Sequence, residues 1–156
     1  MNNKILVAFD DSENAMRAVE YIAKYFATDT IITLFNIAQD TATLCDMNSP
    51  ELTPYFKSQQ SSFCTLEEKK KSLVDIALQK AREKLIAAGF EEKNIDIKTE
   101  SKKKGVARDI VKEAQSGYNT IVLGRRGQSG IKDFILGSVS HKVFQLVKDI
   151  SVLVVN

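Results

Sequence analysis

Two short segments of this 156-residue chain combine residue types that bind anionic ligands. The first is Asp10-Asp11-Ser12, which directly follows an apolar run. The second is a glycine-rich series that holds four of the seven glycines of the chain, at Gly124, Gly127, Gly130 and Gly137. Glycine lets backbone approach a ligand closely, and Ser138 adds a hydroxyl directly after the last of these glycines. A helix that begins at Ser138 would present free N–H groups and the positive end of its dipole, which together form an anion site.

Each feature taken singly also has a purely structural interpretation. The glycines could serve only a tight turn, and Ser138 could serve only as a helix cap worth about 1 kcal/mol. The two segments together favour phosphate binding, because both are expected at the ends of neighbouring strands. The pattern G-x-x-x-x-G-K-[ST] is absent, and no G-x-G-x-x-G follows the first apolar run, so these two nucleotide motifs are excluded.

The elements that must position these residues are short apolar runs alternating with segments of helical period. Strand patterns lie at residues 5–9, 31–37, 95–98, 120–123 and 151–155, and helical patterns lie at 12–26, 66–88, 106–115 and from 137 onward. This alternation predicts an α/β fold with a parallel sheet, right-handed crossovers and helices on both faces. Ligands bind such sheets at the carboxyl ends of the strands, where both segments are expected to lie.

Residues 38–65 show no clear periodicity. They contain both prolines of the chain, Pro50 and Pro54, and are rich in Ser, Thr, Asn and Gln, so we predict a long flexible loop with at most a short helical turn. Cys45 and Cys64 lie in this stretch without C-x-x-C spacing, and we expect free thiols rather than a disulfide. The chain has one histidine, which argues against a Cys/His zinc site.

Composition indicates a single domain over residues 1–156. The chain has a mass of 17.4 kDa, with 44% apolar and 27% charged residues. A net charge of +2 gives no electrostatic case for a nucleic acid or membrane partner. The apolar run at residues 5–9 is too short for a signal peptide or a membrane span, so we expect a soluble, cytoplasmic protein.

The segment Gly124-x2-Gly127-x9-Gly137-Ser138 fits the G-2x-G-9x-G-[S/T] signature of the universal stress protein family, in its ATP-binding branch. Residues 5–12 resemble the opening strand and D-x-S turn of that family, and residues 151–155 resemble its last strand. The resemblance covers the whole chain. It implies a three-layer, Rossmann-like domain of the adenine nucleotide alpha hydrolase type, with a five-stranded sheet of order 3-2-1-4-5. It also implies ATP as a regulatory or sensing ligand, with Mg²⁺ or Mn²⁺ as a possible companion ion.

The resemblance assigns roles to individual residues by position. Asp10 would hydrogen-bond the ribose hydroxyls. Ala8 and Ile37 would border the adenine, with the Ile37 backbone reading its edge, and Leu123 and Gly124 would line the ribose side. The phosphates would be surrounded by main-chain N–H groups and hydroxyls of Gly127, Gly137, Ser138, Val139 and Ser140.

Several residues depart from the family pattern. Arg125 and Arg126 stand where small or singly basic residues are more usual; they are either phosphate contacts or solvated loop arginines, and Arg126 is retained as a candidate ATP contact. His141 stands where an acidic residue is more usual, and we expect a surface histidine. Asp11 either assists a metal ion or points to solvent or the helix start. The ligands of any metal stay unassigned.

The strand at residues 151–155 predicts a partner. In the implied order it is a sheet edge, and its continuous apolar run carries no charge or proline that would prevent pairing. Pairing with the same strand of a second copy would give a two-fold homodimer, and universal stress proteins commonly dimerise in this way.

Other functional classes fit the residues less well. A signalling receiver domain would use Asp10-Asp11 for magnesium, but Thr99-Glu100 stands where its phosphoacceptor aspartate is needed. A single histidine supports no Ser-His-Asp arrangement, so at most slow ATP hydrolysis or autophosphorylation on Ser138 or Ser140 is expected. We predict an ATP-binding stress protein that acts on an unidentified protein partner. The alternative is a dimeric interaction module that binds no nucleotide.

Overall fold

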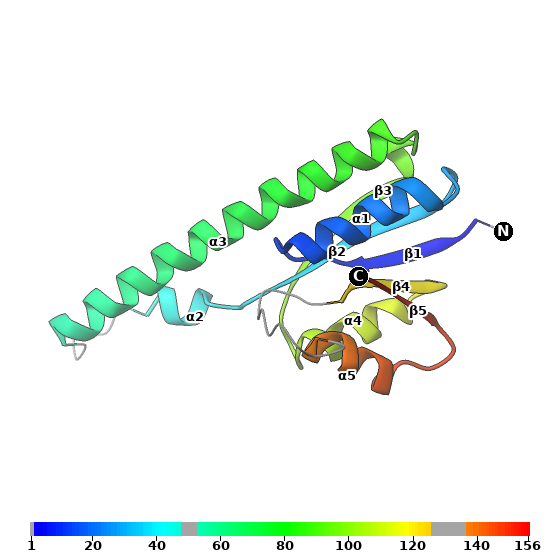
Figure 1. Ribbon diagram of the computed structural model, residues 1–156. Helices are drawn as coiled ribbons and strands as arrows, with labels where there is room; N and C mark the ends of the chain where they lie inside the picture. The colour runs from blue at the N-terminus through cyan, green and yellow to red at the C-terminus, as the bar shows by residue number, and fades with distance from the viewer. Residues whose placement is uncertain (1, 48–52, 126–136) are drawn as a thin grey trace.

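The computed structural model describes residues 2–47, 53–125 and 137–156. Five parallel strands form one sheet of order β3-β2-β1-β4-β5, which confirms the predicted topology. The strands are β1 (Lys4–Ala8), β2 (Ile31–Ala38), β3 (Ile95–Ser101), β4 (Thr120–Gly124) and β5 (Ser151–Val155). Figure 1 shows their carboxyl ends directed toward the same side of the molecule.

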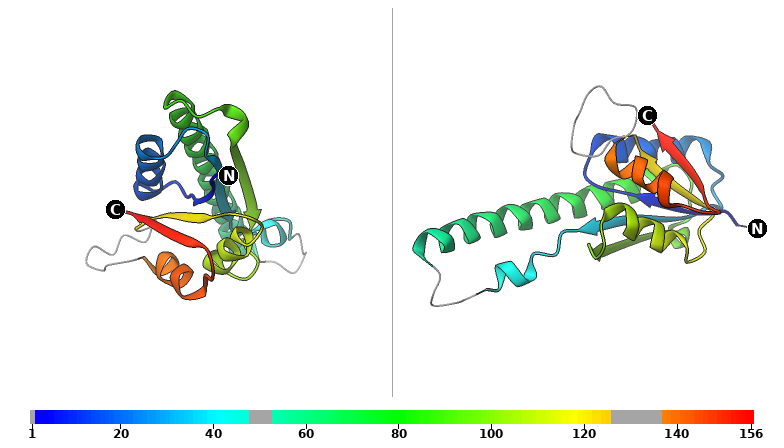
Figure 2. Two further views of the ribbon diagram at one scale, coloured as in Figure 1. Left: turned by 90° about the vertical axis from the view of Figure 1, so that its right-hand side faces the viewer. Right: turned by 90° about the horizontal axis from the view of Figure 1, so that it is seen from below.

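Helices cover both faces of the sheet (Figures 1 and 2). α1 (Glu13–Tyr25) and α3 (Pro54–Ala87) pack on one face, and α4 (Val106–Ala114) and α5 (Ser138–Leu146) pack on the other. Alternate residues of β1 serve the two cores, since Ile5 and Val7 pack with α1 and α3 while Leu6 packs with α4. A strand buried on both faces reads as the continuous apolar run seen in the sequence. Among the described residues, no helix is both long and apolar enough to cross a bilayer.

Local signals in the sequence set the ends of these helices. The Ser12 hydroxyl accepts the Ala15 N–H at 3.2 Å and caps α1. Just after the C-terminal end of α3, Gly89 has φ +101°. The Gly89 N–H donates to the Ile86 carbonyl, and the Phe90 N–H donates to the Leu85 carbonyl. This is the left-handed glycine cap expected at Gly89.

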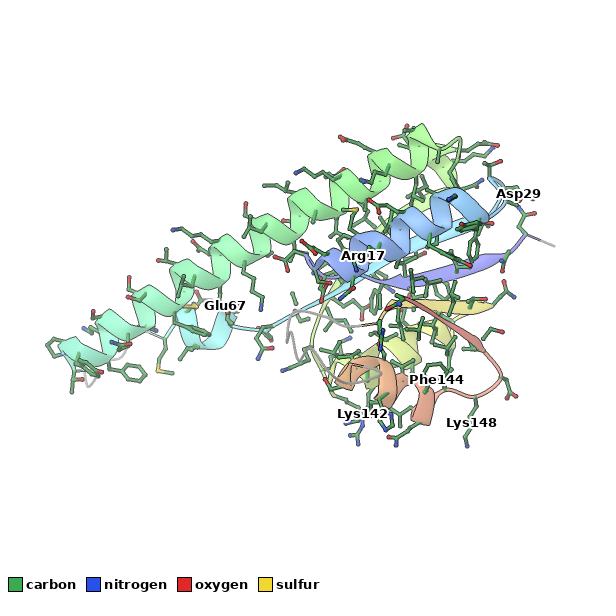
Figure 3. The ribbon with its side chains drawn as sticks, in the orientation of Figure 1. Arg17, Asp29, Glu67, Lys142, Phe144 and Lys148 are labelled. Atoms are coloured by element: carbon green, nitrogen blue, oxygen red, sulfur yellow. A yellow bond between two sulfur atoms is a disulfide. The ribbon has the colours of Figure 1, made fainter. Side chains whose placement is uncertain are left out.

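The long loop predicted over residues 38–65 is wrong for residues 54–65, which are helical, whereas the expected short helical turn is present at Ala42–Cys45. α2 (Ala42–Cys45) follows β2 closely, and α3 begins at Pro54, about three turns before the predicted start at Leu66. The Thr53 hydroxyl caps α3 by accepting the Phe56 N–H at 3.2 Å. All of the buried residues of α3 lie at or beyond Val74, and its first half extends past the sheet, as the position of Glu67 shows (Figure 3). Because the first half of α3 packs against neither hydrophobic core, its apolar residues show no helical periodicity.

The expectation of free thiols is also wrong. Cys45 and Cys64 form a disulfide between α2 and α3, with Cα atoms 5.9 Å apart. The Gln60 side chain adds to this contact by donating to the Leu44 and Met47 carbonyls. The pairing depends on the early start of α3, because that helix brings Cys64 back beside α2.

Reduction of the disulfide should loosen the first half of α3 without disturbing the sheet. This half makes no contact with either core, and an isolated helix of its length is marginally stable in water. On addition of a reductant, we expect amide exchange over residues 54–66 to accelerate by about tenfold or more, while exchange in β1 and β4 is unchanged. Amide exchange measured by mass spectrometry tests this. The control is a Cys45→Ser/Cys64→Ser variant, in which residues 54–66 should exchange fast both with and without reductant. Unchanged protection of residues 54–66 on reduction would contradict it.

Candidate functional site

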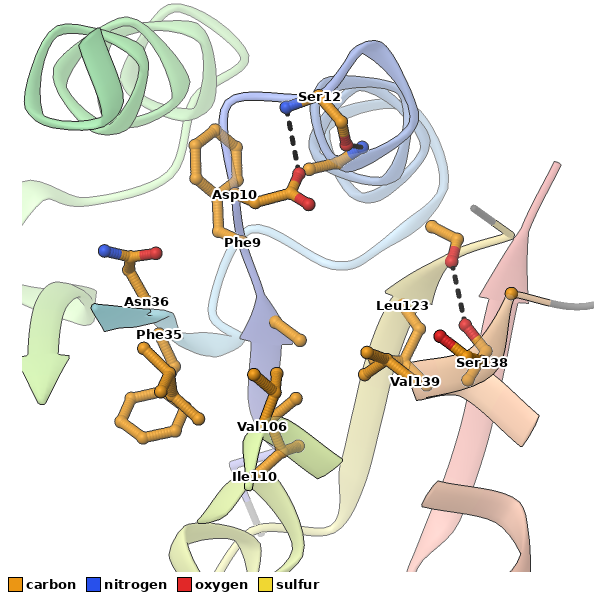
Figure 4. Close-up of a pocket in the computed structure, with 16 residues that line it drawn as sticks. Phe9, Asp10, Ser12, Phe35, Asn36, Val106, Ile110, Leu123, Ser138 and Val139 are labelled. Atoms are coloured by element: carbon orange, nitrogen blue, oxygen red, sulfur yellow. Dashed lines mark hydrogen bonds between the residues drawn. The ribbon is translucent and has the colours of Figure 1, made fainter. Parts of the chain in front are cut away.

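A pocket of about 290 Å³ opens at the carboxyl ends of β1, β2 and β4, beside the start of α5 (Figure 4). All of the predicted contact residues that the structure describes line it: Ala8, Asp10, Ile37, Leu123, Gly124, Gly137, Ser138, Val139 and Ser140. The two remaining candidates, Arg126 and Gly127, lie outside the described residues. Residues from the two segments that the sequence singled out therefore meet at one cavity.

Asp10 is fixed at the rim of this pocket. One of its carboxylate oxygens accepts the Ser12 N–H at 2.9 Å, and Ser12 is in turn held as the cap of α1. Figure 4 shows this bond above the end of β1. Within the described residues no other hydrogen bond to the Asp10 side chain is found, so its second oxygen can accept hydroxyl groups of a ligand.

The start of α5 forms the opposite side of the pocket. Gly137 is the N-cap residue, and no side chain in the described part of the chain caps the helix. The first N–H groups of α5 therefore point outward without a partner from the helix itself, and the helix dipole adds partial positive charge. Backbone bonds hold this end in place, since the Gly137 N–H donates to the Arg125 carbonyl at 2.8 Å and the Arg125 N–H donates to the Val155 carbonyl at 2.8 Å.

Ser140 and Gly124 have structural roles beside their place in the pocket. The buried Ser140 hydroxyl donates to the Gly124 carbonyl at 3.1 Å and so joins α5 to β4. A Cβ atom on Gly124 would lie 2.7 Å from the carbonyl carbon and oxygen of Asn14, so only glycine fits between β4 and α1. The close packing of a helix against a strand explains this glycine without a ligand.

Seven of the described residues that line the pocket were not among the predicted contacts: Phe9, Ser12, Ala15, Phe35, Asn36, Val106 and Ile110. Val106 and Ile110 come from the start of α4, which follows the carboxyl end of β3, so the rule that located the other segments could have found them. Asn36 is the one polar residue among the last four residues of the apolar run 31–37. Its position near the end of a predicted strand could have marked it as a pocket residue.

Asp109 holds the connection that brings Val106 into the pocket wall. Its buried carboxylate accepts the N–H groups of Lys103 at 2.8 Å and Lys104 at 3.1 Å. These backbone hydrogen bonds, with that from Lys103 the largest contribution, lower the pKa of Asp109 below its ordinary value. Gly105 lies between Lys104 and Val106, the first residue of α4, and has φ +129°, a backbone conformation that favours glycine.

Replacing Asp109 with asparagine should lower the free energy of unfolding by about 2 kcal/mol at pH 7. A carboxyl whose pKa is lowered by folding stabilises the protein above its unfolded pKa of about 3.9, and this contribution is lost as the pH falls through the folded pKa. The difference between wild type and Asp109→Asn should therefore narrow below about pH 4. Urea unfolding at pH 7 and at lower pH tests this, and a difference independent of pH would contradict it.

The remaining candidates lie apart from the pocket. Asp11 does not line it, and one Asp11 carboxylate oxygen is buried without a hydrogen-bond partner in the described part of the chain. His141 is exposed, as expected, with a ring nitrogen 3.1 Å from the Gln145 amide nitrogen. The described residues contain no group of three or more His, Cys, Asp or Glu side chains that could hold a metal ion, so they assign no metal ligands.

Comparison with known proteins identifies relatives of this chain. The profile described as the universal stress protein family matches residues 1–156. Universal stress protein YxiE of Bacillus subtilis (strain 168) is 32% identical over 147 residues, which is 94% of this chain and 94% of the relative.

Solved structures share the fold over nearly the whole chain. Universal stress protein UspA from Lactobacillus plantarum aligns with a TM-score of 0.69 at 18% identity, covering 99% of this chain and 97% of that one. The hypothetical protein MJ0577 aligns with a TM-score of 0.67 at 23% identity, covering 99% and 96%. A universal stress protein in complex with cAMP aligns with a TM-score of 0.63 at 19% identity, covering 99% and 97%. With the sequence match over its full length, the chain belongs to the universal stress protein family.

Proposed function

We propose that this universal stress protein binds ATP as a regulatory ligand in the pocket at the carboxyl end of its sheet. The observation that carries the proposal is the combination, in one cavity, of apolar walls, a fixed carboxylate and an uncapped helix start. A relative of the same fold is known in complex with cAMP, which supports an adenine nucleotide as the ligand class.

Each part of a nucleotide has a matching part of the pocket. Ala8 and Ile37 offer apolar surface for a base, Leu123 and Gly124 line the ribose side, and the free oxygen of Asp10 is placed for ribose hydroxyls. The Ser138 and Val139 N–H groups at the start of α5 suit a phosphate chain. The volume of about 290 Å³ is at the lower end for ligand pockets, so the distal phosphates would extend beyond it, past Gly137.

Arg126 and Gly127 belong to this proposal as contacts of the phosphate chain. They follow Arg125, whose backbone is fixed to both β5 and Gly137 at the edge of the pocket. A guanidinium group there would add charge-assisted hydrogen bonds to a triphosphate. Mg²⁺ or Mn²⁺ would enter with the nucleotide, bound by its phosphate oxygens.

The nucleotide that the protein carries tests the proposal directly. Mass spectrometry of small molecules released by denaturing freshly purified protein should detect an adenine nucleotide near one equivalent per chain. The Gly137→Asp variant, whose carboxylate would occupy the proposed phosphate site at the start of α5, is the matched control and should release none. Wild-type protein that releases no nucleotide, and binds none when ATP is added, would favour the alternative of an interaction module without a nucleotide.

We also propose a homodimer through β5. This strand is an edge of the sheet, and Val152, Leu153 and Val154 are only half-buried in the single chain. Antiparallel pairing with β5 of a second copy would satisfy the free backbone groups and cover these side chains. Sedimentation at tens of micromolar should give about twice the chain mass of 17.4 kDa, and a single species at the chain mass would contradict the dimer.

A further inference from the structure

A nearly buried carboxamide that has no partner among the described residues lines the pocket. Asn36, on β2, is 8% exposed, and none of the described residues hydrogen-bonds to its side chain. Its polar atoms are not sealed from the cavity, because they are absent from the fully buried, unsatisfied atoms of the described chain. Buried polar side chains are nearly always paired, so this carboxamide calls for a partner inside the pocket.

The position of Asn36 shows which part of a ligand it would meet. Phe35 and Ile37 pack with the core on the α4 side of the sheet. Asn36 points to the other side of the sheet, the side on which Phe9 lies (Figure 4). The start of α5, at Ser138, lies across the pocket from it, with Asp10 between the two. Asn36 is thus on the side away from the anion site, among apolar neighbours. A ligand group that reaches this side of the pocket would therefore be a heterocycle rather than a phosphate.

We propose that Asn36 contacts the edge of the nucleotide base and favours adenine; this rests on the proposed function. A carboxamide offers one acceptor and two donors side by side. Its oxygen can accept from an exocyclic amine while its nitrogen donates to the adjacent ring nitrogen, the pairing that asparagine makes with adenine. Asn36 carries no charge, so it adds no repulsion toward the phosphates.

Two variants separate this role from a structural one. Asn36→Leu has a similar shape and removes both hydrogen-bonding functions, and it should raise thermal stability because an unpaired buried polar group is lost. Asn36→Asp keeps the shape of the side chain but leaves only hydrogen-bond acceptors. These acceptors would face the lone pair of an adenine ring nitrogen without a hydrogen bond, whereas they could accept from the neighbouring N–H donors of guanine.

Calorimetric titration tests the proposal. The purified protein, in whatever oligomeric state it has, is titrated separately with ATP, GTP and inorganic tripolyphosphate in the presence of Mg²⁺. Asn36→Leu should bind ATP about tenfold more weakly than wild type and bind tripolyphosphate equally well. Asn36→Asp should lower the ratio of ATP to GTP affinity by about tenfold. The control is Thr33→Val, a polar-to-apolar change at a buried position on the same strand that does not line the pocket. It should leave the affinity for ATP unchanged.

The outcomes distinguish this inference from the proposed function. Equal ATP affinity for wild type, Asn36→Leu and Asn36→Asp would overturn the role of Asn36 while leaving ATP binding intact. A wild-type protein that binds no nucleotide would overturn both. An Asn36→Leu variant that melts at a lower temperature and loses tripolyphosphate binding as well would show that Asn36 supports the fold rather than the base.

Discussion

Replacing Gly137 with aspartate should weaken ATP binding by about 100-fold or more while leaving the protein folded. Gly137 is the N-cap residue of α5, with φ −64° and ψ 159°, an extended conformation that any residue adopts. Aspartate is a preferred N-cap residue, and its carboxylate would accept the N–H groups at the start of α5. These are the groups proposed to bind phosphate, so a fixed negative charge would replace the ligand.

This substitution separates binding from stability. Since the new side chain caps a helix whose N-cap residue is a glycine, the melting temperature should stay the same or rise. Gly137→Asn is the matched control, because it also caps the helix but carries no charge, and it should weaken ATP binding by only about tenfold. Calorimetry and thermal unfolding measure the two properties separately. A folded Gly137→Asp protein with wild-type affinity would rule out this helix start as the phosphate site.

Replacing Gly124 with valine should lower the free energy of unfolding by about 3 kcal/mol or more. The added Cβ atom would lie 2.7 Å from backbone atoms of Asn14 and 2.9 Å from its Cβ. Backbone cannot rotate away as the end of a long side chain can, so α1 would have to move from β4. Such a shift would also displace Asp10, which is joined through Ser12 to the start of α1.

Urea unfolding measures this effect, with Gly117→Ala as the comparison. Gly117 has φ +107° and open space around its Cβ position, so its replacement brings backbone strain without a steric clash. We expect a loss of about 1 kcal/mol at Gly117. An equal or smaller loss for Gly124→Val would mean that α1 and β4 can separate easily.

The parts of the fold that the sequence predicted are those whose patterns arise from burial. β1 is buried on both faces and reads as an uninterrupted apolar run, and α1 shows a regular apolar face because that face meets the sheet. The strand order came from the family resemblance. The glycine series and the acidic pair were located by a general rule, since ligands of such sheets bind at the carboxyl ends of strands.

The predictions failed where packing does not shape the sequence. The first half of α3 meets no core, so its apolar residues follow no period, and only the local signal of Thr53 followed by Pro54 marked its start. The disulfide was missed for the same reason, because it requires the helix that brings Cys64 to Cys45. Asn36 was overlooked because a single polar residue in an apolar run was read as part of the strand.

Titration of wild-type protein with ATP in the presence of Mg²⁺, followed by calorimetry, tests nucleotide binding most directly. We predict saturable heat with one nucleotide per chain, and binding to Gly137→Asp that is weaker by about 100-fold or more. Absence of heat from folded wild-type protein at millimolar ATP, together with an empty pocket in crystals grown with the nucleotide, would contradict it.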